Sequence, residues 1–178
     1  AAKAEPKPFS RALNRALHEG PISFNGKGNF CVLTRSNYGE PDEEGEVNFG
    51  LYFSRLVKGK WMDPVPFQYN DPAYSLGQAC LNSKGDRLYF SSDMPGGKGG
   101  TDIWLSEYRD SSWTKPRPIY SVNTEGDETA PFFLESGILL FASDGHLGLG
   151  GYDIFAAKQQ GNSFVKIRNL GAPVNSAG

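Results

Sequence analysis

The chain contains few cysteines and histidines and has no large excess of either charge. Its 178 residues include two cysteines and two histidines, and the formal net charge is −2. Two cysteines are too few for a disulfide framework. Cys31 and Cys80 are therefore expected to be buried free thiols, with a single disulfide or a paired metal or redox role as the alternatives. Without a basic excess, the sequence lacks the electrostatic footprint of a nucleic-acid-binding protein.

Long hydrophobic runs are also missing. No stretch approaches the ~18 apolar residues that a membrane span requires. The opening AAKAEPKPFS has no hydrophobic core of a signal peptide, which a mature or excised chain would have lost.

Recognisable catalytic motifs are absent as well. The sequence has no G-x-S-x-G motif, no zinc-ligand spacing of His and Cys, and no Gly-Lys-Ser/Thr phosphate loop. His18 and His146 occupy non-matching positions in different repeats, which indicates two polar loop residues. We therefore expect no enzyme and no cofactor, although paired carboxylates for glycoside hydrolysis could still come from different repeats.

Glycine, proline and aromatic residues are abundant instead. The chain has 22 Gly, 12 Pro and 13% aromatics, a mixture that favours many short strands joined by sharp turns. The stretch FSSDMPGGKGGTDIWLSE is followed by FASDGHLGLGGYDIFAAK, which places Asp102 and Asp153 51 residues apart. Two further series of residues recur at nearly the same spacing: Trp61, Trp113 and Phe164, and Asn14, Asn70, Asn123 and Asn175. The first copy of the motif is degenerate, with Ser36 and Gly50 at the positions of Asp93 and Asp102.

Each repeat of about fifty residues reads as four short strands. In the second copy they are expected at 78–82, 86–92, 102–108 and 112–120. Residues 10–20 have local helical propensity, but they align with the linker after the last strand of the other repeats, and we favour that register. Four strands per repeat is the signature of a β-propeller blade.

The sequence therefore predicts an all-β fold of three four-stranded propeller blades from a ring expected to have six. The expected division is 1–19 as the end of a preceding blade with its linker, and 20–77, 78–129 and 130–178 as blades. Three blades cannot close a ring. The chain is thus expected to be part of a longer chain or to pair with another copy, because open blade faces and strand edges invite association.

The repeat motif resembles a known family. S-S-D-x-P-G-G-x-G-G-x-D-I-W and A-S-D-G-H-x-G-x-G-G-Y-D-I-F look like WD40-like repeats of the TolB-type propeller class. The glycine-rich loop before Asp-Ile-aromatic resembles propellers of Bacteroidetes cell-envelope proteins. These include PorE-like components associated with type IX secretion and proteins with an OmpA-like peptidoglycan-binding domain. The resemblance implies a periplasmic, outer-membrane-associated protein with protein partners.

Six carboxylates are the candidate site residues. They flank the glycine-rich loops or lie in the linkers, and one end of a propeller would gather them: Asp93, Asp102, Asp127, Glu128, Asp144 and Asp153. The plain interpretation is that they accept loop amides or are solvated. The alternatives are a calcium or other hard cation, a phosphate cradle, and a polar face for a peptide or glycan.

The function predicted from these observations is a non-enzymatic interaction or scaffold module of the bacterial cell envelope. The rival hypothesis is the propeller domain of a hydrolase, either a prolyl-oligopeptidase-type peptidase or a glycosidase.

Overall fold

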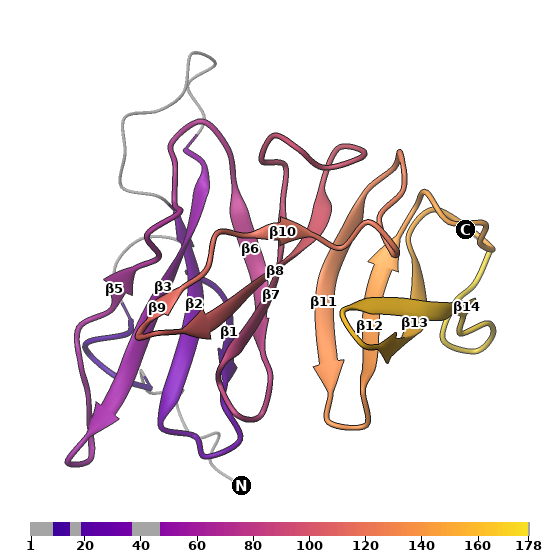
Figure 1. Ribbon diagram of the computed structural model, residues 1–178. Coiled ribbons are helices and arrows are strands. Elements are labelled where there is room, and N and C mark those ends of the chain that lie inside the picture. Colours follow the sequence, from indigo (N-terminus) through magenta and orange to yellow (C-terminus); the bar gives the residue numbers. More distant parts are fainter. Residues whose placement is uncertain (1–8, 15–18, 37–46, 178) are drawn as a thin grey trace, which may run out of the picture.

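The computed structural model describes residues 9–14, 19–36 and 47–177. All regular structure in this part is β-strand, arranged as three antiparallel sheets that stand side by side (Figure 1). The all-β prediction is confirmed. No helix among the described residues is long and apolar enough to cross a membrane.

Each sheet corresponds to one predicted blade. The first contains β1 (Glu19–Phe24), β2 (Phe30–Ser36), β3 (Phe49–Val57), β4 (Lys60–Trp61) and β5 (Val65–Pro66). The second contains β6 (Leu76–Leu81), β7 (Arg87–Ser92), β8 (Asp102–Arg109), β9 (Ser112–Trp113) and β10 (Arg117–Pro118). The third contains β11 (Glu128–Leu134), β12 (Ile138–Ser143), β13 (Asp153–Gln160) and β14 (Ser163–Asn169).

The outermost strand differs from the prediction. Residues 112–120 were expected to form one strand, but β9 and β10 are two short pieces that pair with opposite ends of β8. Pro116 lies between the two pieces and explains the break, because proline has no N–H to donate to a ladder. The first sheet is split in the same way at Pro64, between β4 and β5.

The innermost strands join neighbouring sheets. β6 lies beside β1 and β11 lies beside β6. β6 and β11 carry a bulge at Gln78 and Ala130, both with positive φ. The bulge amides donate across to the preceding sheet, from Gln78 to Thr34 Oγ1 (3.1 Å) and from Ala130 to Ser91 Oγ (3.1 Å). The bulges therefore tie each blade to the one before it.

The hydrophobic core lies between the sheets. One cluster joins the first and second sheets through Leu51, Phe53, Leu81 and Phe90. A second joins the second and third sheets through Tyr89, Ile103, Phe141 and Phe155. Each sheet thus buries a face against its neighbour, as stacked propeller blades do.

A repeated asparagine fastens each linker to its own blade. Asn123 Oδ1 accepts from Ile103 N (3.0 Å), and its Nδ2 donates to Ile103 O (3.1 Å). Asn70 makes the same pair of bonds with Leu51, and Asn175 with Ile154. This side chain therefore mimics a backbone strand partner, which explains the asparagine series in the sequence.

The described residues of segment 10–20, for which helix and linker were both considered, adopt the conformation of a linker. Leu13 N and Asn14 N both bond to Ser10 O, as Val122 N and Asn123 N bond to Ile119 O. No helix is present among the described residues of this segment, 10–14 and 19–20. Residues 1–8, His18 with its neighbours 15–17, and the acidic loop 37–46 of the first repeat lie outside the described residues.

Candidate functional site

The carboxylate that opens β8 is inside the protein. Asp102 is 1% exposed, and its Oδ2 accepts hydrogen bonds from Lys98 N (2.7 Å) and Gly99 N (3.3 Å) of the glycine-rich loop. The loop can approach because it is glycine-rich: a Cβ on Gly97 would lie 1.7 Å from Asp102 Oδ2. Asp102 therefore holds the loop by its backbone.

The equivalent carboxylate in the third blade has a side chain among its partners. Asp153 Oδ2 accepts from Leu149 N and also from Asn169 Nδ2 (2.9 Å). Asn169 pairs with Phe155 in the sheet, and the matching position opposite Trp104 is Pro118. Proline offers no side-chain donor, and Asp102 Oδ1 is buried without a hydrogen-bond partner in the described part of the chain.

The pKa values of the two aspartates shift in opposite directions. Burial raises the pKa of Asp102 above its ordinary value, against the loop amides of Lys98 and Gly99, which lower it. The backbone amide of Leu149 lowers the pKa of Asp153, with help from Asn169. Desolvation thus dominates the pKa of Asp102, and hydrogen bonding dominates that of Asp153.

The linker carboxylates also contact backbone amides. Asp127 Oδ1 accepts from Thr101 N (2.6 Å), and Asp144 Oδ1 accepts from Asp127 N (2.7 Å). Asp93 lies apart from this pair, where it accepts from Ser75 N (2.8 Å). These bonds connect the loops and linkers at one end of the blades.

Glu128 is the most enclosed of the six. It is 0% exposed and accepts from Thr124 N (2.6 Å), Thr124 Oγ1 (2.7 Å) and Ser143 Oγ (2.6 Å). The structure therefore brings Asp127 and Asp144 together and surrounds Glu128 with donors. Within the described residues no three His, Cys, Asp or Glu side chains form a group that could hold a metal ion.

Tyr152 lies at the exposed side of Asp127 and Asp144. Tyr152 OH donates to Asp127 Oδ2 (3.0 Å). Desolvation and then the hydrogen bond to Asp127 raise the pKa of Tyr152 to about 12. The phenol is therefore a fixed donor and not a base near neutral pH.

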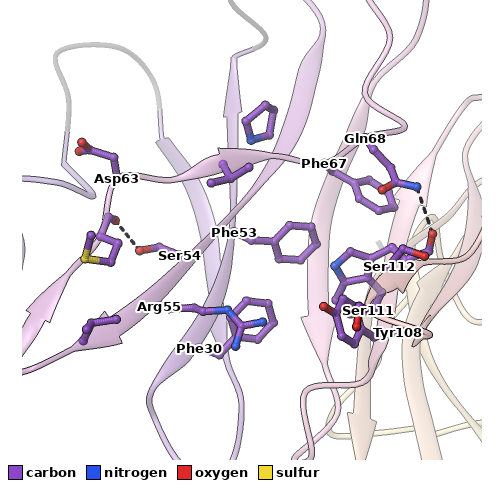
Figure 2. Close-up of a pocket in the computed structure, with 15 residues that line it drawn as sticks. Phe30, Phe53, Ser54, Arg55, Asp63, Phe67, Gln68, Tyr108, Ser111 and Ser112 are labelled. Carbon is purple, nitrogen blue, oxygen red and sulfur yellow. Dashed lines mark hydrogen bonds between the residues drawn. The ribbon is translucent and has the colours of Figure 1, made fainter.

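A concave site lies elsewhere, between the outer parts of the first and second blades (Figure 2). We call it the aromatic groove. It has a volume of about 350 Å³. Its lining residues come from β2, β3, β5, β8 and β9, from the segments just before β5 and β9, and from the linker after β5: Phe30, Phe53, Ser54, Arg55, Val57, Met62, Asp63, Val65, Pro66, Phe67, Gln68, Tyr108, Ser111, Ser112 and Trp113.

Stacked rings form the floor of the aromatic groove. Phe53 stacks on Phe30 on one side (5.6 Å, 8°) and on Trp113 on the other (5.2 Å, 13°). Tyr108 meets Trp113 edge-on at 5.3 Å. The Arg55 guanidinium lies 4.8 Å from the Phe30 ring centroid. The rings are held by neighbours in both blades, so the floor is preorganised.

Polar groups lie around this floor (Figure 2). Gln68 Nε2 donates to Trp113 O (3.1 Å), and Ser54 Oγ donates to Met62 O (2.6 Å). These hydrogen bonds between lining residues hold the walls of the groove in place. Asp63, Ser111 and Ser112 complete the polar part of the lining.

Sequence reasoning did not find the aromatic groove. Its rings belong to two repeats and are separated by more than fifty residues, as with Phe53 and Trp113. The repeated tryptophan was visible as a series, but the series also fits a core position. One feature of the sequence could have indicated the groove. The first repeat has the aromatic residues Phe30 and Phe53 at the positions where the third repeat has Ile138 and Ala156.

Cys31, Cys80 and His146 are buried or make a contact inside the fold. Cys31 and Cys80 are free and buried. Burial raises the pKa of Cys31 to about 11 and raises that of Cys80. His146 is not simply a polar loop residue, because its Nε2 contacts Val122 O (2.7 Å) and its ring packs on Phe155.

Comparison with known proteins identifies the fold by structure. No family model matches the sequence, and no curated protein matches it. TolB from Acinetobacter baumannii superposes with a TM-score of 0.57 at 15% identity, covering 92% of this chain and 35% of that one. A putative TolB from Agrobacterium tumefaciens gives 0.59 at 13% identity, covering 89% and 51%. The fold is that of a TolB-type β-propeller.

Hydrolases share this TolB-type fold. A puromycin-hydrolyzing peptidase of Mycobacterium tuberculosis superposes with a TM-score of 0.60 at 15% identity, covering 89% of this chain and 22% of that one. The chain thus spans between about a fifth and about half of the length of these structures. At such identities the likeness extends to the fold alone.

Proposed function

We propose that this TolB-type propeller chain is a non-catalytic module that binds a protein partner in the bacterial cell envelope. The aromatic groove carries the proposal. Concave, mostly apolar sites with a few placed polar groups are the usual form of a binding pocket. Rigid aromatic side chains bind at a low cost in conformational entropy, and they are enriched where partners make their strongest contacts.

The groove is proposed to take an apolar or aromatic side chain from an extended peptide segment. Val65 is 64% exposed on the rim, and Met62 is also exposed. The short outer strands β5 and β9 border the groove, so strand edges lie beside the pocket. Edge pairing with alternate side chains in pockets is a common mode of peptide recognition.

The carboxylates support a non-catalytic function. All six accept backbone amides of loops or linkers, and Glu128 also accepts bonds from the hydroxyls of Thr124 and Ser143. Groups used in this way fix the backbone at the end of each blade. The periplasmic location, the outer-membrane association and the link to type IX secretion or peptidoglycan anchoring are proposals that rest on the family resemblance and the TolB-type fold.

A display library of random 12-residue peptides tests the groove. We expect selection on the immobilised chain to enrich peptides that carry aromatic or large aliphatic residues. Val65→Asp should weaken their binding at least tenfold, because it places a charge on the apolar rim. Leu147→Asp is the matched control, since Leu147 is 98% exposed in a loop of the third blade. Equal binding to the wild type and to Val65→Asp would contradict the proposal.

The rival function, the propeller domain of a hydrolase, is favoured by the peptidase neighbour. It is tested separately by incubating the chain with Gly-Pro-4-nitroanilide and with 4-nitrophenyl arabinofuranoside. Release of 4-nitroaniline or 4-nitrophenol that is abolished by substituting Asp127 or Glu128 would replace the binding proposal with catalysis.

A further inference from the structure

A second hollow lies where the innermost strands of the three blades meet, beside the glycine-rich loop of the second blade. We call it the hydroxyl pocket. It has a volume of about 520 Å³, within the range of roughly 300–1,000 Å³ that small-ligand sites occupy. β1 contributes Gly20 and Pro21 to its lining, β6 contributes Gly77 and Gln78, and β11 contributes Thr129. All three blades therefore build one site.

The lining of the hydroxyl pocket is polar and nearly uncharged. Of its 13 residues, six carry a hydroxyl group and two carry a carboxamide. Asp93 is the one charged residue among the described residues of the lining, and Phe49, which is 45% exposed, is the one aromatic residue. An anion would meet no cationic partner here, and an apolar side chain would leave the polar groups without hydrogen bonds. The composition instead suits an uncharged ligand with many polar groups.

Gln78, the bulge residue of β6, is held by one end of its side-chain amide. Its Oε1 accepts a hydrogen bond from Ala130 N (2.9 Å). This bond fixes the orientation of the amide, and it leaves the two N–H groups of Nε2 to donate to a ligand.

Asp93 and two threonines supply further hydrogen-bonding groups. Asp93 Oδ1 accepts from Ser75 N (2.8 Å), which leaves Oδ2 as an acceptor. The hydroxyl groups of Thr101 and Thr129 make no hydrogen bond within the described residues. Because a hydroxyl group both donates and accepts, the pocket offers donors and acceptors together.

The backbone that carries the Phe49 ring is fixed by a short hydrogen-bond chain. Phe49 N donates to Ser75 Oγ (3.1 Å), and Ser75 Oγ donates to Asn48 Oδ1 (2.7 Å). Asn48 Nδ2 in turn donates to Pro72 O (2.9 Å). The exposed ring is therefore an apolar surface on a preorganised wall, next to the free polar groups.

A sugar ring matches this combination of groups. Each of its hydroxyl groups donates and accepts hydrogen bonds, while the C–H groups on its faces pack against an aromatic side chain. We propose that the hydroxyl pocket binds a neutral pyranose unit of a glycan. Gln78 Nε2 donates to the sugar hydroxyls, Asp93 Oδ2 accepts from them, and Phe49 packs against a face of the ring. The pocket shares no lining residue with the aromatic groove, so this inference does not rest on the proposed function.

Saturation-transfer difference NMR tests the pocket with the methyl glycosides of β-glucose, β-galactose, α-mannose and N-acetyl-β-glucosamine. We expect transfer from the chain to the ring protons of at least one of them. Gln78→Ala should weaken its binding about tenfold, as the loss of one hydrogen bond does. The fold should tolerate this change, because Ala130 has the same positive φ at the aligned position and keeps its bond to Ser91 Oγ. Transfer to none of the four glycosides overturns the proposal.

Gly77→Thr tests the location of the sugar. The new side chain should abolish the transfer by filling the pocket. A Cβ on Gly77 would meet only Thr34 Cγ2, at an ordinary contact distance of 3.5 Å, and the third blade has Thr129 at the aligned position. Val65→Asp, on the rim of the aromatic groove, is the control and should bind the sugar as the wild type does. Unchanged sugar binding by Gly77→Thr, with a β-sheet circular dichroism spectrum, contradicts the proposed site.

The peptides selected on the immobilised chain separate this site from the groove. Loss of peptide binding in Gly77→Thr but not in Val65→Asp would assign the hydroxyl pocket to a peptide and overturn both proposals. Sugar binding that survives Val65→Asp while peptide binding does not would support both. Failure of sugar binding alone removes only the hydroxyl pocket and leaves the groove as proposed.

Discussion

A single amide side chain takes the place of a strand at the end of each linker. Asn123 is 2% exposed and makes both a donor and an acceptor bond to the backbone of Ile103. An amide is the one small side chain that supplies both groups in the required geometry. Replacement by a carboxylate keeps the shape and removes the donor.

We expect Asn123→Asp to lower the free energy of unfolding by about 2–3 kcal/mol, because it loses a bond and leaves a carboxylate against the Ile103 carbonyl. Urea denaturation at pH 7 measures this loss. Asn162→Ala, at an exposed turn position, is the control and should stay within ~0.5 kcal/mol of the wild type. Equal stability of Asn123→Asp and the control would mean that the paired bonds do not fasten the linker.

Asp102 and Asp153 should respond to pH with opposite signs. The pKa of Asp153 is lowered in the folded chain, so its stabilisation is present above the unfolded pKa of about 3.9 and is lost as the pH falls through the lower folded value. The pKa of Asp102 is raised, so its stabilisation is present below about 3.9 and is lost as the pH rises through the higher folded value.

Melting temperatures of the two Asn variants between pH 3 and 7 check this difference. Relative to the wild type, Asp153→Asn should become less stable as the pH rises, whereas Asp102→Asn should become more stable. The two variants serve as controls for each other, because both sit at the same position of a repeated loop. Parallel slopes would contradict the opposite pKa shifts.

At the scale of elements, the glycine-rich loop before β8 packs closely around the carboxylate of Asp102. Gly97→Ala should destabilise the fold by roughly 1–3 kcal/mol, because the new Cβ would collide with Asp102 Oδ2 and displace the loop amides that bind it. Gly151→Ala is a matched change in the equivalent loop, where a Cβ meets nothing within 4 Å. Thermal melts of the two variants compare them, and similar losses would show that the close approach to Asp102 is unimportant.

The elements show where prediction from sequence succeeds and where it does not. The fifty-residue repeat predicted the strand order, because each copy repeats the same alternation and turn residues. The register also placed residues 10–14 in a linker despite their helical propensity. The prediction of the outer strand was wrong in detail, since Pro116 interrupts the ladder that 112–120 was expected to form. Local prolines thus changed the element without changing the fold.

At the scale of the whole molecule, the interfaces between blades carry both stability and the candidate site. Trp113 is nearly buried and contacts Phe53 and Phe67 of the first blade. Trp113→Ala should lower the free energy of unfolding by about 3–5 kcal/mol, as large-to-small core changes do. Met62→Ala, on the exposed rim of the same groove, should cost ~1 kcal/mol or less. Urea denaturation of both variants checks this, and equal losses would contradict it.

The aromatic groove shows why the candidate site was harder to predict than the fold. A repeat motif reports what the blades share, whereas the groove depends on what the first two blades do not share with the third. Phe30 and Phe53 stack in the first blade, and the aligned positions in the third are Ile138 and Ala156. Only the packing of two blades brings these rings to Tyr108 and Trp113.

The asparagine bonds also bear on how the chain acquires its structure during synthesis. Each asparagine follows the residue that it binds by 19, 20 or 21 positions. A ribosome that has just released a linker has therefore already released the whole blade that the linker secures. Because such contacts are local, each blade can be completed before the next emerges, and nascent chains should gain protection from proteases in steps of one blade.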